Sequence, residues 1–300
     1  MIKNRTASLF IILAIYVLAS FCGICAYNYF SAENGLSLSY PLALFLADVL
    51  ATVVVFVFSL IFKNASVYDP YWSVQPPVIL SVAIVKMLAR DADVGASNVS
   101  GASGSSSLIA WLLFSAVMFW ALRLTANWTY NFKSFEYQDW RYVMLKEKSG
   151  RFYGFINFTG IHLFPTCVVY LCVLPAVVAI KEGAVFKPIC AVFVALSFCA
   201  AIFQGIADIQ MHKFRNSGSG GFIRTGLWKH SRHPNYACEI LMWWGIGLAS
   251  VLALGGKPWL LTGATVNTLM FLFVSIPMAD KRQSRKPGFE EYKKQTRMLF

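Results

Sequence analysis

The feature that most constrains this chain is a series of eight long apolar stretches. A helix needs about 20 apolar residues to cross a hydrocarbon core about 30 Å thick. Only 13% of the residues are charged, about half of the roughly 25% typical of soluble domains. The sequence therefore predicts an all-α, polytopic transmembrane helix bundle, with residues 1–300 forming a single membrane domain. The predicted spans are residues 8–30, 40–62, 74–89, 108–126, 159–180, 188–211, 237–255 and 259–279.

The basic residues predict how the bundle is oriented. With a cytosolic N-terminus, 20 of the 26 lysines and arginines fall on the cytosolic side, and four fall in the opposite loops. This split follows the positive-inside rule and predicts that both termini are cytosolic. The net charge of +12 is then explained by topology and by attraction to anionic lipids, so no nucleic-acid partner is expected. The stretches at 74–89 and 259–279 are the weakest, which leaves seven spans as the alternative.

Several polar side chains fall at membrane depth near the end of the sixth span. Gln204 and Asp208 lie on one face of the predicted helix, and Arg215 continues that face towards the cytosol. On the next span, Asn235 and Glu239 are four residues apart and share a face. Charged groups are costly inside a bilayer, so they usually face the bundle interior and serve a function there.

The loop between these two spans combines cations with glycine. Residues 217–221 read Ser-Gly-Ser-Gly-Gly, and Arg224, Lys229 and Arg232 follow before the next helix begins. Arginines, backbone amides and a helix N-terminus are the usual components of phosphate sites. An ordinary cytosolic loop explains the cations but not the carboxylates at membrane depth. The histidines of this loop lack partners at zinc-ligand spacing, so no metal site is expected.

Motifs around this loop resemble those of a known family. The motifs are Gly226-Leu227-Trp228, Ser231-Arg232-His233-Pro234-Asn235-Tyr236 with Glu239, Trp243-Trp244-Gly245, Asp69-Pro70-Tyr71-Trp72, Gln138-Asp139-Trp140-Arg141-Tyr142 and Pro287-Gly288-Phe289. Together they resemble the steroid 5-alpha-reductase superfamily and, within it, the DUF1295 branch of membrane proteins. The resemblance covers residues 65–300, and this chain has Gln138 where the branch usually has Glu.

The resemblance implies that residues 204–300 bind NADPH near the cytosolic face. The cofactor contacts that it implies are Asp208, Arg215, Arg224, Arg232, His233, Asn235, Tyr236, Glu239, Lys281 and Arg282. The implied reaction reduces a C=C bond conjugated to a carbonyl in a lipophilic, steroid-like or enoyl-lipid substrate. Asp69 is the implied acid that polarises the carbonyl, with Tyr68 or Tyr71 as its tyrosine partner.

The expected partners are accordingly a lipophilic small molecule and membrane lipids. The expected location is the endoplasmic reticulum in a eukaryote or the inner membrane in a bacterium. In this interpretation Glu239 accepts hydrogen bonds from the nicotinamide carboxamide and is satisfied only when cofactor is bound. Alternatively, Glu239 is structural and pairs with Arg232 or with another helix.

Two other functions remain open at the level of sequence. An Arg-His-Pro-x-Tyr motif followed by Glu also occurs in isoprenylcysteine and phospholipid methyltransferases, which bind S-adenosylmethionine. That cofactor has no phosphate for a cluster of cations to contact, which favours NADPH. The third interpretation is a non-catalytic membrane scaffold.

Overall fold

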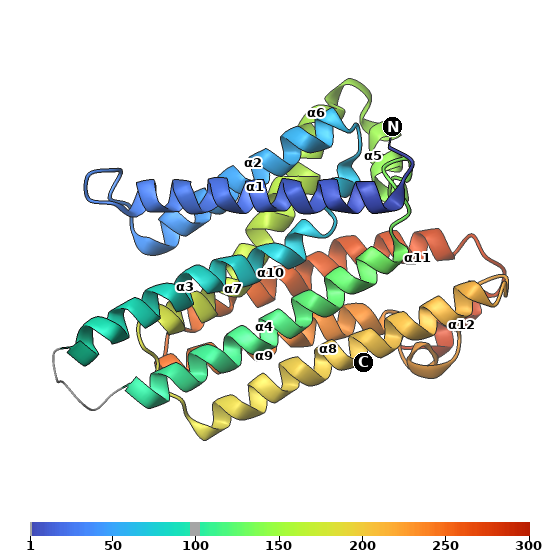
Figure 1. Ribbon diagram of the computed structural model, residues 1–300. Helices are drawn as coiled ribbons and strands as arrows, with labels where there is room; N and C mark the ends of the chain where they lie inside the picture. The colour runs from blue at the N-terminus through green and yellow to red at the C-terminus, as the bar shows by residue number, and fades with distance from the viewer. Residues whose placement is uncertain (1, 97–102) are drawn as a thin grey trace. The chain divides into compact units, whose positions relative to one another are not determined.

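A computed structural model describes residues 2–96 and 103–300, most of which lie in helices (Figure 1). The long helices are α1 (Arg5–Ser31), α2 (Tyr40–Ile61), α3 (Tyr71–Ala96), α4 (Ser103–Asn131), α7 (Phe164–Lys181), α8 (Pro188–Asn216) and α9 (Pro234–Leu254). The shorter helices are α5 (Trp140–Ser149), α6 (Tyr153–Ile156), α10 (Thr262–Met270), α11 (Ile276–Gln283) and α12 (Phe289–Gln295). Six short 3-10 or π-helical segments lie among them: η1 (Ala65–Tyr68), η2 (Gly150–Phe152), η3 (Asn157–Leu163), η4 (Gly226–Lys229), η5 (Pro258–Leu261) and η6 (Phe271–Ser275).

The predicted number of membrane spans is confirmed. Within residues 2–96 and 103–300, 8 helical segments are long and apolar enough to cross a membrane. The third of them is continuous even though Pro76 and Pro77 lie inside α3. Large apolar side chains point outward from these helices, as Phe10 does with 67% of its surface exposed. Such exposure is expected where the surrounding solvent is lipid. The chain is therefore a multi-pass membrane protein.

The fifth span is longer than the sequence predicts. The helical segment runs over Trp140–Lys181, whereas the apolar run predicts only residues 159–180. Asp139 starts α5 by accepting a hydrogen bond from the backbone N–H of Arg141 at 2.9 Å. The π-helical turn η3 then joins α6 to α7. The hydrophobic pattern misses this extension because α5 carries several charged residues and is amphipathic.

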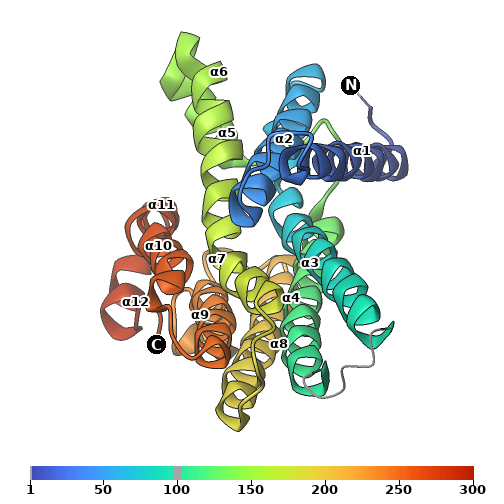
Figure 2. The same cartoon turned by 90° about the vertical axis from the view of Figure 1, so that its left-hand side faces the viewer.

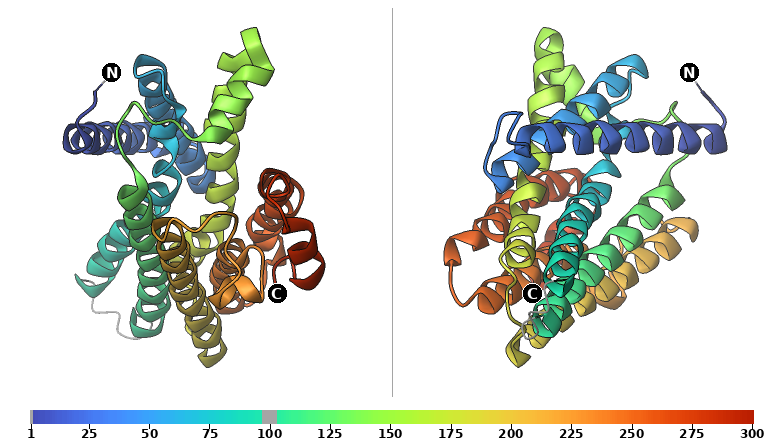
Figure 3. Two further views of the ribbon diagram at one scale, coloured as in Figure 1. Left: turned by 90° about the vertical axis from the view of Figure 1, so that its right-hand side faces the viewer. Right: turned by 60° about the vertical axis from the view of Figure 1, so that its left-hand side comes forward.

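The described residues pack into two compact units. The first unit comprises Met1–Val85 and Leu124–Tyr170, and the second comprises Lys86–Arg123 and Leu171–Phe300. In the first unit α1 packs along α2 (Figure 3). The core of this unit is rich in aromatic side chains, among them Tyr16, Tyr68, Tyr71, Phe132 and Phe135.

In the second unit α8 and α9 lie side by side, and α10 to α12 follow α9 (Figure 2). Gly245 allows the close approach of α8 and α9. A Cβ atom at this position would lie 2.2 Å from Ser197 Oγ and 2.6 Å from the carbonyl oxygen of Phe193. Any larger residue would force the two helices apart, which matters because both helices carry predicted site residues.

Candidate functional site

Glu239 lies deep in the second unit and is held by donors of the protein itself. Its side chain is 1% exposed. Oε2 accepts hydrogen bonds from Trp120 Nε1 and Gln204 Nε2, both at 2.8 Å, and Oε1 accepts one from Trp243 Nε1 at 3.0 Å. The expectation that Glu239 is satisfied only by a bound cofactor is therefore wrong. The structural alternative is nearer the observed geometry, although the partners are N–H donors on α4, α8 and α9 and not Arg232.

Asp208 lies one helical turn from Gln204 and forms an ion pair inside the same unit. Its Oδ2 accepts a hydrogen bond from Arg123 Nη1 of α4 at 2.7 Å. Both side chains are largely buried, at 16% and 13% exposure. Arg123 Nε and Nη2 are buried and have no hydrogen-bond partner within the described residues, and neither has Gln204 Oε1. The interior of this unit thus holds unsatisfied donors and an unsatisfied acceptor beside two carboxylates.

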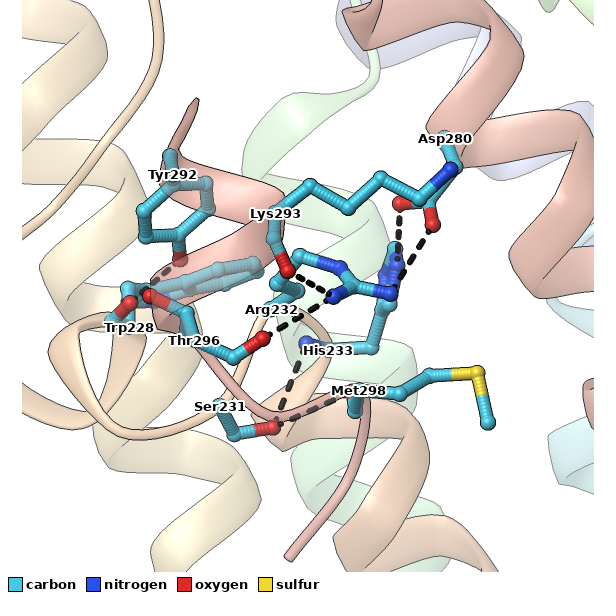
Figure 4. A network of polar contacts seen from close by, with 9 residues as sticks. All are labelled: Trp228, Ser231, Arg232, His233, Asp280, Tyr292, Lys293, Thr296 and Met298. Atoms are coloured by element: carbon cyan, nitrogen blue, oxygen red, sulfur yellow. Dashed lines mark hydrogen bonds and ion pairs between the residues drawn. The ribbon is translucent and has the colours of Figure 1, made fainter. Parts of the chain in front are cut away.

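Arg232 and His233 are occupied in binding the C-terminal segment (Figure 4). Arg232 Nη1 donates to the carbonyl oxygens of Lys293 at 3.0 Å and Thr296 at 2.9 Å, and Nη2 contacts Asp280 Oδ2 at 3.2 Å. His233 Nε2 lies 2.8 Å from the other oxygen of Asp280. These contacts attach the start of α9 to α11 and to the end of the chain. A structural role explains both side chains, and their predicted contact with a cofactor stays a prediction.

We expect Arg232→Ala to release the C-terminal segment from the start of α9. The variant removes charge-assisted hydrogen bonds, and their loss costs about 2 kcal/mol in local stability. Trypsin should then cut after Lys293 and Lys294 about thirtyfold faster, because cleavage follows the population of the opened segment. Arg285→Ala is the control, since Arg285 is exposed in the same region. Equal cleavage rates in the two variants would show that Arg232 does not hold the segment.

Cations lie close together at the end of α8 and in the segment that comes after α11. Lys286 Nζ donates to the carbonyl oxygen of Gly221, in the glycine-rich turn, at 2.6 Å. Partial burial and the neighbouring guanidinium groups of Arg282 and Arg215 lower the pKa of Lys286 below its ordinary value. Neither Arg215 nor Lys286 forms an ion pair within the residues that the structure describes. Three like charges in one place favour the binding of an anion.

Arg224 is held by packing and not by an ion pair. Its guanidinium carbon lies 4.3 Å from the ring centroid of Phe222. Arg224 Nη2 would also lie 2.8 Å from a Cβ atom at Gly288, whose φ of +77° favours glycine. The charge of Arg224 is thus placed without being neutralised by a described carboxylate. An arginine held in this way can present its planar group to a phosphate.

The remaining predicted cofactor residues lie in the same unit. Asn235 and Tyr236 lie in the first turn of α9 and are half-buried. The Tyr236 ring is parallel to that of His233 at a centroid distance of 5.4 Å. Lys281 and Arg282 are exposed at the end of α11.

In the first unit, Asp69 is paired with a tyrosine that the sequence did not predict. The Asp69 carboxylate accepts a hydrogen bond from the hydroxyl of Tyr142 on α5. Nearby, the backbone N–H of Asp139 donates to Ser66 Oγ at 3.0 Å. The fold therefore brings together two of the motifs that carry the family resemblance. The sequence predicts an acid beside a tyrosine, and Asp69 does have a tyrosine partner. That partner is Tyr142, whereas the predicted partner was Tyr68 or Tyr71.

The other two predicted tyrosines have different partners in the same unit. The Tyr68 hydroxyl lies 2.8 Å from Thr166 Oγ1. The Tyr71 hydroxyl donates to Asp48 Oδ1 at 3.4 Å, and Gln75 Nε2 donates to the other oxygen of Asp48. The three predicted catalytic side chains thus do not share one partner. Asp48 and Gln75 had no predicted role.

Comparison with known proteins gives one finding. The model of the family described as "Protein of unknown function (DUF1295)" matches residues 55–296. No curated protein and no solved structure matches the chain. The matched range contains every predicted site residue from Tyr68 to Arg282.

Proposed function

Because the chain belongs to the DUF1295 family, we propose that it is an integral-membrane reductase that uses NADPH. The proposed substrate is a lipophilic molecule with a C=C bond conjugated to a carbonyl, such as a steroid-like or enoyl lipid. The resemblance of the family's motifs to those of steroid 5-alpha-reductases supports this reaction. NADPH, when bound, supplies the hydride.

The cations at the end of α8 are the observation that carries the proposal. NADPH brings a pyrophosphate and a 2′-phosphate, about four negative charges at neutral pH. Arg215, Arg224 and Lys286 would hold these groups, since none of them forms an ion pair with a described carboxylate. S-adenosylmethionine has no phosphate, and its single carboxylate offers these cations one negative charge where NADPH offers about four.

The unsatisfied polar atoms inside the second unit also fit this cofactor. A carboxamide offers one acceptor oxygen and two N–H donors. Arg123 has buried donors without partners, and Gln204 has a buried acceptor without one. Glu239 Oε1 accepts one described hydrogen bond, so this oxygen has capacity for a further donor. These three residues would bind the nicotinamide carboxamide.

In the first unit, the Asp69 and Tyr142 pair would act on the substrate carbonyl. A hydrogen-bond donor aimed at the carbonyl oxygen stabilises the negative charge that develops there during hydride addition. Tyr142 would donate its O–H to this oxygen once Asp69 is protonated and donates to the tyrosine oxygen in turn, which reverses the hydrogen bond between the two side chains. Tyr68 and Tyr71 remain alternatives for the same role.

Ligand-dependent stability tests the cofactor. Thermal melts of the purified full-length chain would be recorded with NADPH, NADH and S-adenosylmethionine, together with the tryptophan fluorescence. We expect NADPH to stabilise the protein and to change the fluorescence, because Trp120 and Trp243 both bond to Glu239. NADH should bind at least about tenfold more weakly, since it lacks the charge-assisted contacts of the 2′-phosphate.

The other outcomes distinguish the competing functions. Stabilisation by S-adenosylmethionine alone would replace the reductase with a methyltransferase. If none of the three ligands stabilises the protein, the scaffold becomes the better explanation. If NADPH binds, its consumption with conjugated enone lipids would then test the reaction itself.

A further inference from the structure

A groove in the first unit lies among α1, α2 and α3. Its interior holds about 40 Å³, or about 450 Å³ when the open space at its mouth is counted. Its walls are mostly small or aliphatic, and Ile24 at the rim is 41% exposed. All three helices belong to segments long and apolar enough to span a membrane. The residues that matter for its chemistry are Ile24, Asp48, Tyr71, Gln75 and Val78.

One wall of the groove carries a buried polar group. Asp48 is 5% exposed and Gln75 is 3% exposed. Gln75 Nε2 and the Tyr71 hydroxyl donate to the two oxygens of Asp48. The carboxyl group is therefore engaged on both sides by neighbours within the protein.

Gln75 Oε1 is the unmatched atom of this group. It is buried and has no hydrogen-bond partner within the described residues. An unsatisfied buried acceptor is unfavourable, and none of the hydroxyl groups that also line the groove, those of Ser20, Tyr27 and Tyr71, donates to it. A partner with one hydrogen-bond donor and an otherwise apolar surface would satisfy the site.

We propose that this groove binds a membrane lipid with a single hydroxyl group at the end of an apolar body. The hydroxyl donates to Gln75 Oε1, and the apolar body lies against Ile24 of α1 and the aliphatic side chains of α3, which are Val74, Val78, Ile79 and Val82. A charged head group does not fit, because no cation or further carboxylate lines the groove. All the residues that line the groove belong to the first unit.

Photolabelling in lipid nanodiscs tests the proposal. The probe is a long-chain primary alcohol with a diazirine near the hydroxyl end. We expect the label on peptides from α1 and α3. Unlabelled hexadecanol should compete about tenfold better than hexadecyl methyl ether or the methyl ketone of the same length, because only the alcohol donates a hydrogen bond. The ether and the ketone keep the apolar body but have no donor.

Two variants locate the site. Gln75→Leu should remove the preference for the alcohol over the ether, because the acceptor is gone. Val78→Phe takes up space in the groove while leaving Asp48 and Gln75 in the sequence, and it should reduce labelling by the probe. Ser81→Ala is the matched control on α3, since Ser81 does not line the groove and bonds to the carbonyl oxygen of Pro77. This variant should label like wild type.

Three results would overturn the proposal. Equal competition by alcohol, ether and ketone in the wild type would show that water satisfies Gln75. A preference for the ketone would show that the amide presents its N–H group to the groove. Unchanged labelling of Val78→Phe would place the probe elsewhere, and this holds even if Gln75→Leu does not fold.

Discussion

Glu239→Leu is expected to lower the melting temperature of the protein, without cofactor, by on the order of 10 °C. The substitution leaves the indole N–H groups of Trp120 and Trp243 and the amide of Gln204 buried without an acceptor. Each such group costs about 1–3 kcal/mol. The gain from removing a buried carboxylate is smaller, because three donors already stabilise it. If Glu239 were instead satisfied only by a bound cofactor, as the sequence suggests, Glu239→Leu without cofactor would be at least as stable as wild type.

Two further variants make this measurement specific. Glu239→Gln keeps one acceptor oxygen but turns an N–H group towards a donor, so its melting temperature should fall between those of wild type and Glu239→Leu. Glu290→Leu is the control, because Glu290 is exposed on α12 and the same chemical change there removes no buried acceptor. If the melting temperature of Glu239→Leu equals that of wild type, the three donors must find other partners.

The fold follows closely from the sequence because lipid imposes a simple requirement. A backbone inside the bilayer must satisfy its hydrogen bonds within a helix, so the length of each apolar run predicts a span. The same rule fails for α5, because its charged residues interrupt the apolar pattern. Asp139 is the N-cap residue of this helix. Hydrophobicity therefore predicts the segments that face lipid and misses the amphipathic helix that extends one of them.

The site is predicted less completely, because partners come from distant parts of the chain. Glu239 is recognised by its depth, yet its donor Trp120 is 119 residues away and belongs to a residue type that is counted as apolar. The partner of Arg123 can be anticipated from the sequence, because an arginine inside a span needs a counter-ion. Asp208 is that counter-ion. Arg232 shows the opposite problem. Its charge suggests a phosphate contact, but the sequence does not reveal the backbone carbonyls that its guanidinium binds.

The Arg215→Ala, Arg224→Ala double variant is expected to bind NADPH about a hundredfold more weakly than wild type, since each charge-assisted phosphate contact is worth about 1.5–3 kcal/mol. The two single variants should each lose about tenfold by the same reasoning. Affinities would be measured by tryptophan fluorescence at low and high salt, because the difference should shrink as salt screens the phosphates. The matched control is Lys229→Ala, Arg285→Ala, which removes two exposed cations from the same region of the chain.

Arginine-to-lysine substitutions test whether each residue acts through the planar geometry of its guanidinium group or through its positive charge alone. Arg224→Lys should recover little affinity, because the planar group lies over the Phe222 ring and beside Gly288, a geometry that an ammonium group does not reproduce. Arg215→Lys should recover more, since Arg215 is exposed at the end of α8 and acts mainly through its charge. If the double alanine variant binds NADPH as tightly as wild type, the cations at the end of α8 do not hold the cofactor. If it instead loses no more than the control pair, only net charge matters, and the assignment of these two arginines to the phosphates fails.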